Sequence, residues 1–470
     1  MALATDDRLG DLLDSYVDDA RLVHVEHLPA RAPTFAAPAR PLPAVLRARL
    51  PGPALYRHQA EAIDLLREGQ SVVVATGTGS GKSLCYQLPI AEAVTTTPPA
   101  TALVVVPTKA LAQDQLRAFG ALGIPGLVAA TYDGDTSTVQ RGWVRRHADV
   151  VFTNPEMLHH GMLAHHPRWA TFLKRLRFIV VDELHLLRGV FGSHVAHVLR
   201  RLRRLCAHYG AAAPTFVFAS ATIGRPESLA RELCGLEVTP VVQAGSATGP
   251  QAFVLWNAHR HHPGDVVQHT PSLSQTCAAI ASQVVRAGHR TIVFARSRAG
   301  AKVTAEALRR ALPARLATGV RTYRAGYLAE ERRSIELELF EGRLSAVVAT
   351  TALELGIDVA GLDACVLGGF PGTLASFWQQ SGRAGRGTDP ALCVLVAGDD
   401  QLDQWFMANP RELCDRPPEP AVVNVANPFI LKPHLRCAAD EGPLDHSDER
   451  YWPGLLDDAV RELVLDGELV

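Results

Sequence analysis

Lysine is scarce in this 470-residue chain: only five of its 47 basic residues are lysines, and arginine supplies the other 42. A GC-rich genome explains this bias better than selection for phosphate binding. Lys82 and Lys109 therefore stand out, because a compact ammonium fits a phosphate-binding loop that a planar guanidinium would overfill. The formal net charge of −1 argues against a uniformly basic surface, although local patches can still bind phosphates.

Paired cysteines and long apolar runs are also missing. None of the eight cysteines forms a C-x-x-C pair, which argues against a zinc ribbon or a disulfide framework. No run reaches the roughly 18 apolar residues that cross a bilayer. The acidic N-terminus lacks the basic and apolar regions of a signal peptide. We therefore expect a cytoplasmic protein without membrane contact, with two or three domains of ordinary globular composition.

Short apolar segments alternate with helical patterns from residue 55 onward, as in parallel sheets with crossover helices. The predicted strands form a first series (71–75, 102–106, 150–153, 178–181, 216–219) and a second series (291–295, 347–350, 364–367, 393–396). Glycines and prolines between 243 and 275 predict the connection between the two series. The predicted parts are an N-terminal segment and proline-rich linker (1–53), two α/β domains (54–250 and 251–418) and the start of an accessory region (419–470).

A Gly-rich segment at 77–83 lies between the predicted strand at 71–75 and a helical pattern. It departs from the strict P-loop only at Thr76, where the pattern has glycine. Lys82 would reach the β- and γ-phosphates, and Ser83 would ligate Mg²⁺. A glycine-rich turn that merely starts a helix is the alternative, and the strand-loop-helix context argues against it. The residues expected to hold the nucleotide are Thr78, Gly79, Ser80, Gly81, Lys82 and Ser83.

An acidic pair, Asp182 and Glu183, follows the predicted strand at 178–181. Doubly wound sheets place ligand contacts at the carboxyl ends of their strands. Asp182 would hold Mg²⁺, and Glu183 would orient or deprotonate the attacking water. In isolation such a pair could equally cap a helix, but the P-loop upstream favours the catalytic interpretation.

Two weaker signals come from polar residues beside predicted strands. Gln59 lies just before the first strand, and its amide can donate and accept at the edge of adenine. Ser220 and Thr222 follow the strand at 216–219, where their hydroxyls could link the nucleotide site to a nucleic-acid surface. An ordinary helix start for Gln59 and a helix N-cap for the hydroxyls remain open alternatives.

The segment 379–387 contains two arginines, Arg383 and Arg386, that could neutralise a transferred phosphoryl group. It lies far downstream of the P-loop segment. Two half-sites so distant in the sequence predict a cleft between two domains.

Eight segments occur in the order and spacing of superfamily 2 helicase motifs. They are Gln59 and the stretches 79–83, 107–111, 153–156, 182–185, 220–222, 349–358 and 379–387. Between residue 55 and about residue 400 the chain therefore resembles these helicases, most narrowly the RecQ-related DNA helicases of the MrfA/SftH type. The segment 81–89 resembles RecQ, while 188–195 and 427–439 resemble the MrfA/SftH group.

The resemblance implies an α/β protein with two tandem RecA-like domains and a C-terminal helical or winged-helix region. ATP and Mg²⁺ would bind between the domains, and single-stranded or partly duplex DNA across their faces. The implied activity is that of an ATP-dependent DNA helicase or translocase that moves 3′ to 5′ in DNA repair or recombination. An ATP-dependent RNA helicase and a nucleotide-gated clamp without unwinding are the alternatives.

The resemblance also implies residue roles. Gln59 would recognise adenine and Asp358 the ribose, while Arg383 and Arg386 would act as arginine fingers. The implied catalytic residues are Lys82, Asp182, Glu183, Gln379, Arg383 and Arg386. The implied nucleic-acid contacts are Thr108, Lys109, Thr153, Thr350 and Thr351, and the implied coupling residues are His185, Ser220 and Thr222.

Two features depart from a full member of this group. The group usually carries a C-terminal zinc-binding region with four clustered cysteines, and this sequence has no such cluster. The sequence also ends within what resembles the start of a winged helix, at 455–464. We therefore expect a truncated protein.

Three further patterns favour ordinary structural roles. Leucines and arginines alternate at 199–205, which predicts an amphipathic helix with solvated arginines rather than a DNA-binding patch. The histidine groups at 159–160, 165–166 and 259–262 lack the spacing of metal ligands. For Phe377 and Trp378, core packing is at least as well supported as stacking on a base.

Overall fold

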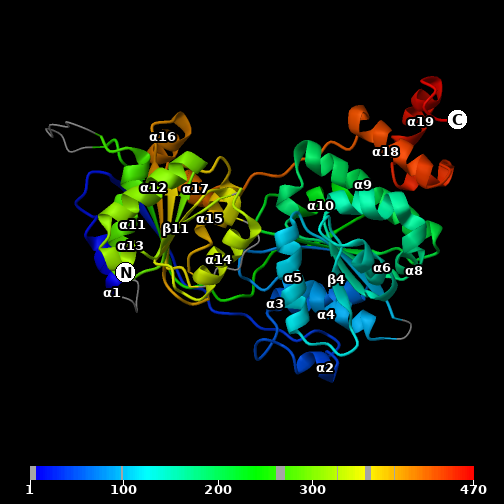
Figure 1. Ribbon diagram of the computed structural model, residues 1–470, viewed down its shortest axis with the longest axis horizontal. Helices are drawn as coiled ribbons and strands as arrows, with labels where there is room; N and C mark the ends of the chain where they lie inside the picture. Colours follow the sequence, from blue (N-terminus) through cyan, green and yellow to red (C-terminus); the bar gives the residue numbers. More distant parts are fainter. Residues whose placement is uncertain (1–6, 97–98, 261–269, 325, 355–360, 386) are drawn as a thin grey trace. The chain divides into compact units, whose positions relative to one another are not determined.

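A computed structural model describes residues 7–96, 99–260, 270–324, 326–354, 361–385 and 387–470 of the chain (Figure 1). Its internal contacts divide the chain into two compact units. The first unit contains Met1–Thr34, Gly77–Ser80 and Ser246–Glu419. The second unit contains Phe35–Thr76, Gly81–Gly245 and Pro420–Val470.

The second unit is built on a seven-stranded sheet in the order β4-β5-β3-β6-β7-β2-β8, in which every neighbouring pair is parallel. Its strands are β2 (Val72–Ala75), β3 (Thr101–Val105), β4 (Ala129–Thr131), β5 (Val150–Thr153), β6 (Leu176–Val181), β7 (Thr215–Ser220) and β8 (Thr239–Val241). The central strands are runs of Val, Ile and Phe buried on both faces, as helix-covered parallel sheets require. The five strands predicted in this part are therefore confirmed, and the two edge strands β4 and β8 were not foreseen.

Helices connect these strands. They are α2 (Ala44–Arg47), α3 (Arg57–Arg67), α4 (Ser83–Val94), α5 (Lys109–Ala121), α6 (Thr138–His147), α7 (Pro155–Met157), α8 (Ala170–Lys174), α9 (Gly189–His208) and α10 (Pro226–Cys234). A π-helix (Leu158–Met162) and two 3₁₀ helices (Leu163–Trp169 and Leu184–Leu186) complete the unit. The apolar faces of α4 and α5 pack with the strands in one hydrophobic core.

The first unit contains a second seven-stranded sheet, in the order β1-β9-β14-β13-β10-β12-β11. Its strands are β1 (Leu22–Leu28), β9 (Gln251–Asn257), β10 (Thr291–Ala295), β11 (Val320–Tyr323), β12 (Ala346–Ala349), β13 (Ala364–Gly368) and β14 (Ala391–Ala397). The pairs are parallel except for β1, which runs antiparallel to β9. The predicted second strand series is confirmed, with β11 added at one edge.

The helices of the first unit flank this sheet. They are α1 (Asp7–Asp14), α11 (Leu273–Arg286), α12 (Arg298–Ala311), α13 (Ala314–Ala317), α14 (Ala329–Phe340), α15 (Leu374–Ser381), α16 (Gln401–Ala408) and α17 (Arg411–Asp415), with a 3₁₀ turn at Thr351–Leu353. Two hydrophobic clusters fill the two sides of the sheet.

The segment 243–275 is not only a connection, as the sequence predicted, because it contains β9. This strand is buried from Ala252 to Asn257 and pairs with β14 and β1. The sequence prediction overlooked the short apolar run of this strand because glycines and prolines lie on both sides of it. The N-terminal part likewise adds β1 to this sheet, and Tyr16 packs edge-on against Trp256 at 5.0 Å between ring centroids.

The C-terminal region of the second unit folds beside α9 (Figure 1). It consists of α18 (Pro428–Glu441), a 3₁₀ helix (His446–Arg450) and α19 (Leu456–Leu465), with a small core that includes Leu435, Trp452 and Leu463. Trp452 Nε1 donates to His197 Nδ1 of α9 at 3.1 Å. This core is therefore joined to α9 by polar contacts as well as by packing.

The prediction that the arginines of 199–205 are solvated is wrong for three of them. Arg200, Arg201 and Arg204 are buried, and Arg201 is only 1% exposed. Arg201 forms a two-point ion pair with Glu441, and Arg204 Nε donates to Asp448 Oδ1 at 2.9 Å. Helical periodicity identified the apolar face of α9, but it could not reveal that a distant segment covers the polar face.

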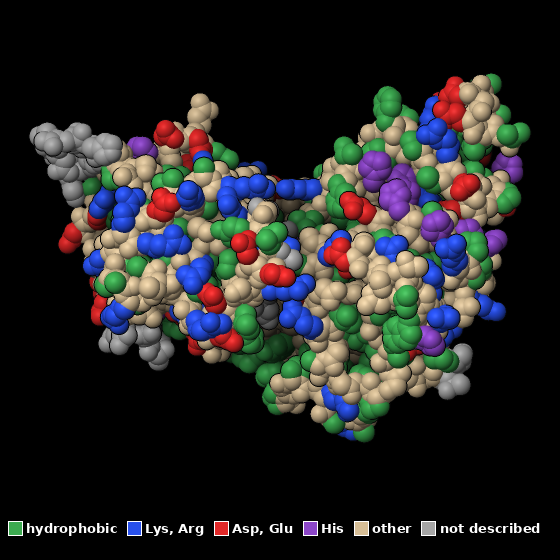
Figure 2. Space-filling model, viewed as in Figure 1, with side chains coloured by type: hydrophobic (Ala, Val, Ile, Leu, Met, Phe, Trp, Pro, Cys, Tyr) green, Lys and Arg blue, Asp and Glu red, His purple; other side chains and the backbone are tan. Residues whose placement is uncertain are grey.

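Histidines surround the Arg201–Glu441 pair and reach the surface near α9 and α18 (Figure 2). Arg201 Nη1 lies 2.9 Å from His159 Nδ1 and 3.2 Å from His434 Nδ1. Because arginine can only donate, both of these ring nitrogens must accept. His434 Nε2–H then points to His194 Nδ1 at 3.0 Å. The contacts therefore require neutral imidazoles at 159 and 434.

Electrostatics agree with that protonation state. Burial is the main cause that lowers the pKa of His434 to about 2, and neighbouring His197 and Arg201 lower it further. Burial together with Arg201 lowers the pKa of His159 to about 4.

Among the described residues, no group of three or more His, Cys, Asp or Glu side chains could hold a metal ion. His261 and His262 lie outside the described residues.

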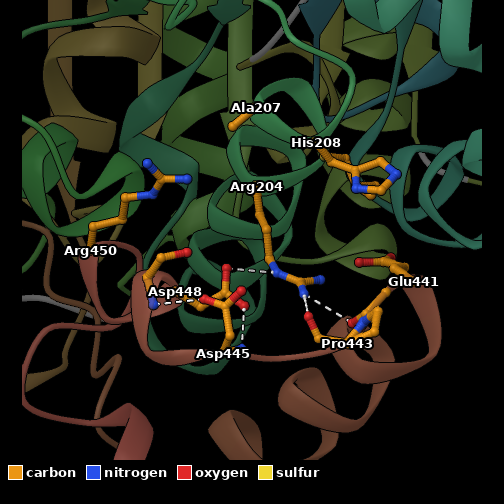
Figure 3. A pocket seen from close by; sticks show the side chains of 11 residues that line it. Arg204, Ala207, His208, Glu441, Pro443, Asp445, Asp448 and Arg450 are labelled. Atoms are coloured by element: carbon orange, nitrogen blue, oxygen red, sulfur yellow. Dashed lines mark hydrogen bonds and ion pairs between the residues drawn. The ribbon is translucent and has the colours of Figure 1, made fainter.

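A cavity of about 190 Å³ lies next to this junction, between α9 and the loop after α18 (Figure 3). The Arg204 guanidinium on its wall donates to the carbonyls of Ala438 and Gly442 at 2.7 and 2.9 Å, in addition to its bond to Asp448. Arg204 therefore holds the C-terminal region against α9.

No helix in the described parts of the chain is long and apolar enough to span a membrane.

Glu441→Ala should lower the free energy of unfolding by about 3–5 kcal/mol, because it leaves the Arg201 charge buried without its carboxylate. Urea unfolding followed by circular dichroism measures this loss. The matched control is Glu468→Ala, which removes the partly exposed Arg436–Glu468 pair and should cost less than about 1 kcal/mol. Equal costs for the two variants would contradict the structural role of the buried pair.

Stability should also fall in mild acid. The pKa values of His159, His197 and His434 are lowered below their ordinary value of about 6.5, so the unfolded chain binds more protons below that pH. The stabilisation is fully present above pH 6.5 and is lost progressively as the pH falls through about 4, 3 and 2, the folded-state pKa values of His159, His197 and His434. Thermal unfolding at pH 7.5 and 5.5 measures the effect. His434→Asn keeps an acceptor near Arg201 but cannot titrate, and an unchanged pH dependence in this variant would contradict the assignment.

Candidate nucleotide-binding site

The P-loop segment connects the buried strand β2 to α4, as the sequence predicted. Gly79 and Gly81 have positive φ values of 72° and 77°, a conformation that L side chains rarely adopt. Lys82 Nζ donates to the Thr76 carbonyl at 2.9 Å and so bridges the two ends of the loop. The Lys82 side chain thus links the end of the loop to its beginning. The loop backbone is curved in the way that a phosphate-binding loop needs.

Gln59 supports this loop from α3. Its side chain is only 2% exposed, accepts from Tyr56 N at 2.9 Å and donates to the Gly81 carbonyl at 2.9 Å. The contact is so close that a Cβ at Gly81 would lie 2.7 Å from Gln59 Nε2. Gln59 therefore fixes the C-terminal end of the loop, and its predicted contact with adenine stays a prediction.

Asp182 and Glu183 follow β6 directly. Asp182 Oδ1 accepts from Glu183 N at 2.9 Å, and burial raises the pKa of the Asp182 carboxyl although that N–H and Lys82 favour its ionised form. Glu183 is in the left-handed region (φ 54°, ψ 45°), which is uncommon for a residue with a side chain and is typical of functional sites. Glu183 Oε2 lies 3.5 Å from His185 Nδ1. Burial, with Lys82 and Arg188 nearby, lowers the pKa of His185 to about 3, so this ring is neutral at pH 7.

The strand order brings the predicted segments of the second unit to one edge. Strands β3, β6, β7 and β2 are consecutive neighbours and parallel, so the residues after each strand lie at the same edge of the sheet. The side chains that follow these strands there are Lys82, Ser83, Thr108, Lys109, Asp182, Glu183, Ser220 and Thr222. Ser220 is fully buried at the end of β7, and Thr222 is exposed.

The candidate nucleic-acid residues of this unit differ in accessibility. Thr108 caps α5 by accepting from Leu111 N at 3.2 Å, and Lys109 pairs with Asp135 at 2.6 Å on the surface. Thr153 is fully buried, and its hydroxyl donates to the Tyr132 carbonyl at 2.7 Å. Its hydroxyl is therefore used internally, and the predicted contact of Thr153 with nucleic acid stays a prediction.

In the first unit, the segment around Arg383 lies at the end of α15. Gln379 and Arg383 are 4% and 6% exposed, and Arg383 Nη2 donates to the Glu354 carbonyl. Thr350 and Thr351 follow β12, and Thr351 is exposed. Asp358 and Arg386 lie outside the described residues, so their predicted roles stay predictions.

The aromatic pair before this segment belongs to the core. Phe377 is 1% exposed, and the Trp378 ring packs against Phe253 with 5.2 Å between centroids. Core packing, one of the two interpretations of the sequence, is therefore correct for Phe377.

Two side chains beside Asp182 were missed by sequence reasoning. Gln115 of α5 donates from Nε2 to Asp182 Oδ2 at 3.2 Å, and Tyr86 of α4 donates from its hydroxyl to Gln115 Oε1 at 2.8 Å. Tyr86 lies three residues after Ser83, a spacing that places both on one helix face. Gln115 carried no signal, because only the packing of α5 against the sheet brings it to Asp182.

Comparison with protein families assigns the class of this protein. The DEAD/DEAH box helicase domain matches residues 56–229, the helicase conserved C-terminal domain matches residues 275–388, and the winged helix domain of the ATP-dependent helicase HRQ1 matches residues 423–469. The chain is a superfamily 2 helicase core with two tandem RecA-like domains and a C-terminal winged-helix domain. The predicted fold class is confirmed.

Individual relatives show which helicases within this class the chain is similar to. The chain is 41% identical to the uncharacterized ATP-dependent helicase YprA of Bacillus subtilis over 84% of its own length and 53% of YprA. It is also 41% identical to the ATP-dependent helicase HRQ1 of Saccharomyces cerevisiae, over 84% of the chain and 38% of HRQ1. The crystal structure of the DUF1998 helicase MrfA bound to DNA and AMPPNP matches 97% of the chain and 64% of that structure, with a TM-score of 0.91 and 37% identity.

The chain therefore belongs to the RecQ-related superfamily 2 helicases of the MrfA type, as the sequence motifs indicated. It spans about half the length of YprA and less of HRQ1.

The contact between Gln59 and Gly81 can be tested with a matched pair of glycines. Gly81→Ala and Gly69→Ala both place a side chain at positive φ, a strain of about 1–2 kcal/mol, but only Gly81→Ala displaces Gln59. We expect similar losses of thermal stability and a loss of affinity of about tenfold or more for a fluorescent ATP analogue in Gly81→Ala alone. Equal affinities in the two variants would contradict the assigned role of this contact.

Proposed function

We propose that this chain is an ATP-dependent DNA translocase or helicase, whose cycle of ATP binding and hydrolysis drives movement along a DNA strand. The main support is the similarity of nearly the whole chain to MrfA, whose crystal structure contains DNA and AMPPNP. The relatives named as ATP-dependent helicases agree with it. The observed P-loop and the acidic pair at the same sheet edge supply the chemistry that such a cycle needs.

ATP would bind with its phosphates in the curved loop, where the ammonium of Lys82 replaces its bond to Thr76 by contacts to the β- and γ-phosphates. Mg²⁺ would be held by Ser83 and Asp182. The site fits this ion, since the Asp182 carboxylate and the Ser83 hydroxyl are oxygen donors at one sheet edge and Mg²⁺ prefers oxygen ligands. When bound, Mg²⁺ would neutralise charge on the phosphates.

Hydrolysis would depend on Glu183, which lies next to Asp182 and would orient and deprotonate the attacking water. Arg383 and Arg386 would neutralise the charge that develops on the transferred phosphoryl group, with Gln379 near the γ-phosphate. The neutral His185 beside Glu183, together with Ser220 and Thr222, would couple this site to the nucleic acid.

DNA would contact Thr108 and Lys109 at the start of α5 and Thr350 and Thr351 after β12. The exposed Lys109–Asp135 pair contributes little stability, so a phosphate can replace Asp135 at small cost. At position 153, the backbone rather than the hydroxyl would face the phosphates. A 3′ to 5′ direction and a role in DNA repair or recombination are parts of the same proposal that rest on the resemblance. A cytoplasmic location is a further part that rests on the sequence alone.

Single-stranded DNA should stimulate ATP hydrolysis by the chain, and Glu183→Gln should reduce kcat by about 10²–10⁴-fold because the general base is removed. A coupled ATPase assay with and without DNA measures both effects. Glu237→Gln is the control, since the Glu237 side chain is 84% exposed and pairs with Arg231 on the surface of the second unit. It should behave as the wild type.

Three outcomes would overturn parts of this function. Stimulation by RNA of matched sequence but not by DNA would favour an RNA helicase. Binding of ATP and DNA without any turnover would favour a nucleotide-gated clamp. Full turnover in Glu183→Gln would remove Glu183 from the mechanism.

A further inference from the structure

A chain of hydrogen bonds leads from the interior of α4 to Asp182, a residue expected to hold Mg²⁺. The Tyr86 hydroxyl donates to Gln115 Oε1 at 2.8 Å, and Gln115 Nε2 donates to Asp182 Oδ2 at 3.2 Å. Tyr86 lies on α4, Gln115 on α5, and Asp182 follows β6. Three elements that are far apart in the sequence therefore meet through side chains alone.

Chemistry fixes the direction of this chain. A carboxylate can only accept, so the Gln115 amide must present its nitrogen to Asp182 and its oxygen to Tyr86. Tyr86 must then use its only hydroxyl hydrogen on Gln115.

Burial makes these bonds costly to break. Tyr86 is 1% exposed and Asp182 8% exposed, so water cannot easily replace a lost partner. Asp182 Oδ1 is already held by Glu183 N at 2.9 Å, and Gln115 holds the other oxygen. Both oxygens of the carboxylate are thus oriented, which preorganises it as a metal ligand.

We propose that Tyr86 and Gln115 are positioning residues that hold Asp182 in the orientation that binds Mg²⁺–ATP, a step that rests on the function proposed above. Neither residue would touch the nucleotide. They act by orienting the carboxylate.

The hydrogen-bonded chain from Tyr86 through Gln115 to Asp182, called the relay below, includes a helix that also carries predicted DNA contacts. Gln115 belongs to α5, which begins at Lys109 and is capped by Thr108. A rigid helix therefore carries both the residues expected to grip DNA and the amide that orients Asp182. In the proposed mechanism, DNA bound at the start of α5 strengthens Mg²⁺ binding through Gln115.

The test uses Gln115→Met, which keeps the length of the side chain but cannot hydrogen-bond Asp182, and Tyr86→Phe, which removes only the hydroxyl. Binding of a fluorescent non-hydrolysable ATP analogue is titrated with Mg²⁺, with and without single-stranded DNA. We expect the Mg²⁺ concentration for half-maximal binding to rise about 10–100-fold in Gln115→Met, as for other residues that orient metal ligands. Tyr86→Phe should shift it in the same direction, and the double variant should add little because both act through one chain.

Gln113→Met is the matched control, because Gln113 lies on the same helix but donates to Thr131 Oγ1 at 3.1 Å instead of to Asp182. It should bind Mg²⁺ and analogue as the wild type does. An unchanged half-maximal Mg²⁺ concentration in Gln115→Met, or an equal shift in Gln113→Met, would overturn the proposal. Thermal unfolding in EDTA reports general destabilisation, and a fall there without a Mg²⁺ shift would also overturn it.

Two further comparisons separate this proposal from the proposed function. DNA should lower the half-maximal Mg²⁺ concentration of the wild type and not of Gln115→Met, and an equal effect of DNA on both would overturn the coupling through α5. Because the analogue is not hydrolysed, the relay is tested even if the wild-type chain has no ATPase activity. In that case the motor function fails while a Mg²⁺ shift in Gln115→Met still supports the relay.

Discussion

Neighbouring parallel strands end at the same edge of a sheet, and the candidate site depends on this constraint. In the second unit β3, β6, β7 and β2 lie side by side, so the P-loop, the start of α5, the acidic pair and Ser220 converge although more than a hundred residues separate the first from the last. The loops can carry charged groups because the buried strands beneath them hold the backbone in place. The positive φ values of Gly81 and Glu183 are tolerated at this edge for the same reason.

A second requirement is that buried polar groups find partners. It explains the polar contacts at two places in the second unit, the nucleotide site and the C-terminal region. At the nucleotide site it produces the chain from Tyr86 through Gln115 to Asp182. At the C-terminal region it produces the buried pair of Arg201 and Glu441. In each case the partners come from distant segments, so the polar contacts select one arrangement of elements that apolar packing alone would leave less defined.

Local patterns predicted the fold well where the signal is local. Runs of β-branched residues identified the central strands, and the glycines around Lys82 identified the loop. The predictions failed where a residue's environment comes from elsewhere. Strand β9 was hidden between glycines and prolines, and Arg201 looked solvated because its partner Glu441 lies on α18. The bond from the Thr153 hydroxyl to the Tyr132 carbonyl likewise had no signal in the sequence.

The sequence by itself determined the class of protein, because Lys82, Asp182, Glu183 and Arg383 occur in the order and spacing of superfamily 2 helicase motifs. It determined the alternation of strands and helices for the same local reasons. Only the tertiary structure decided which side chains orient those residues: Gln59 against Gly81, Gln115 against Asp182, and Glu441 against Arg201. A hydrogen bond acts over about 3 Å in space, whereas a sequence pattern records only neighbours along the chain.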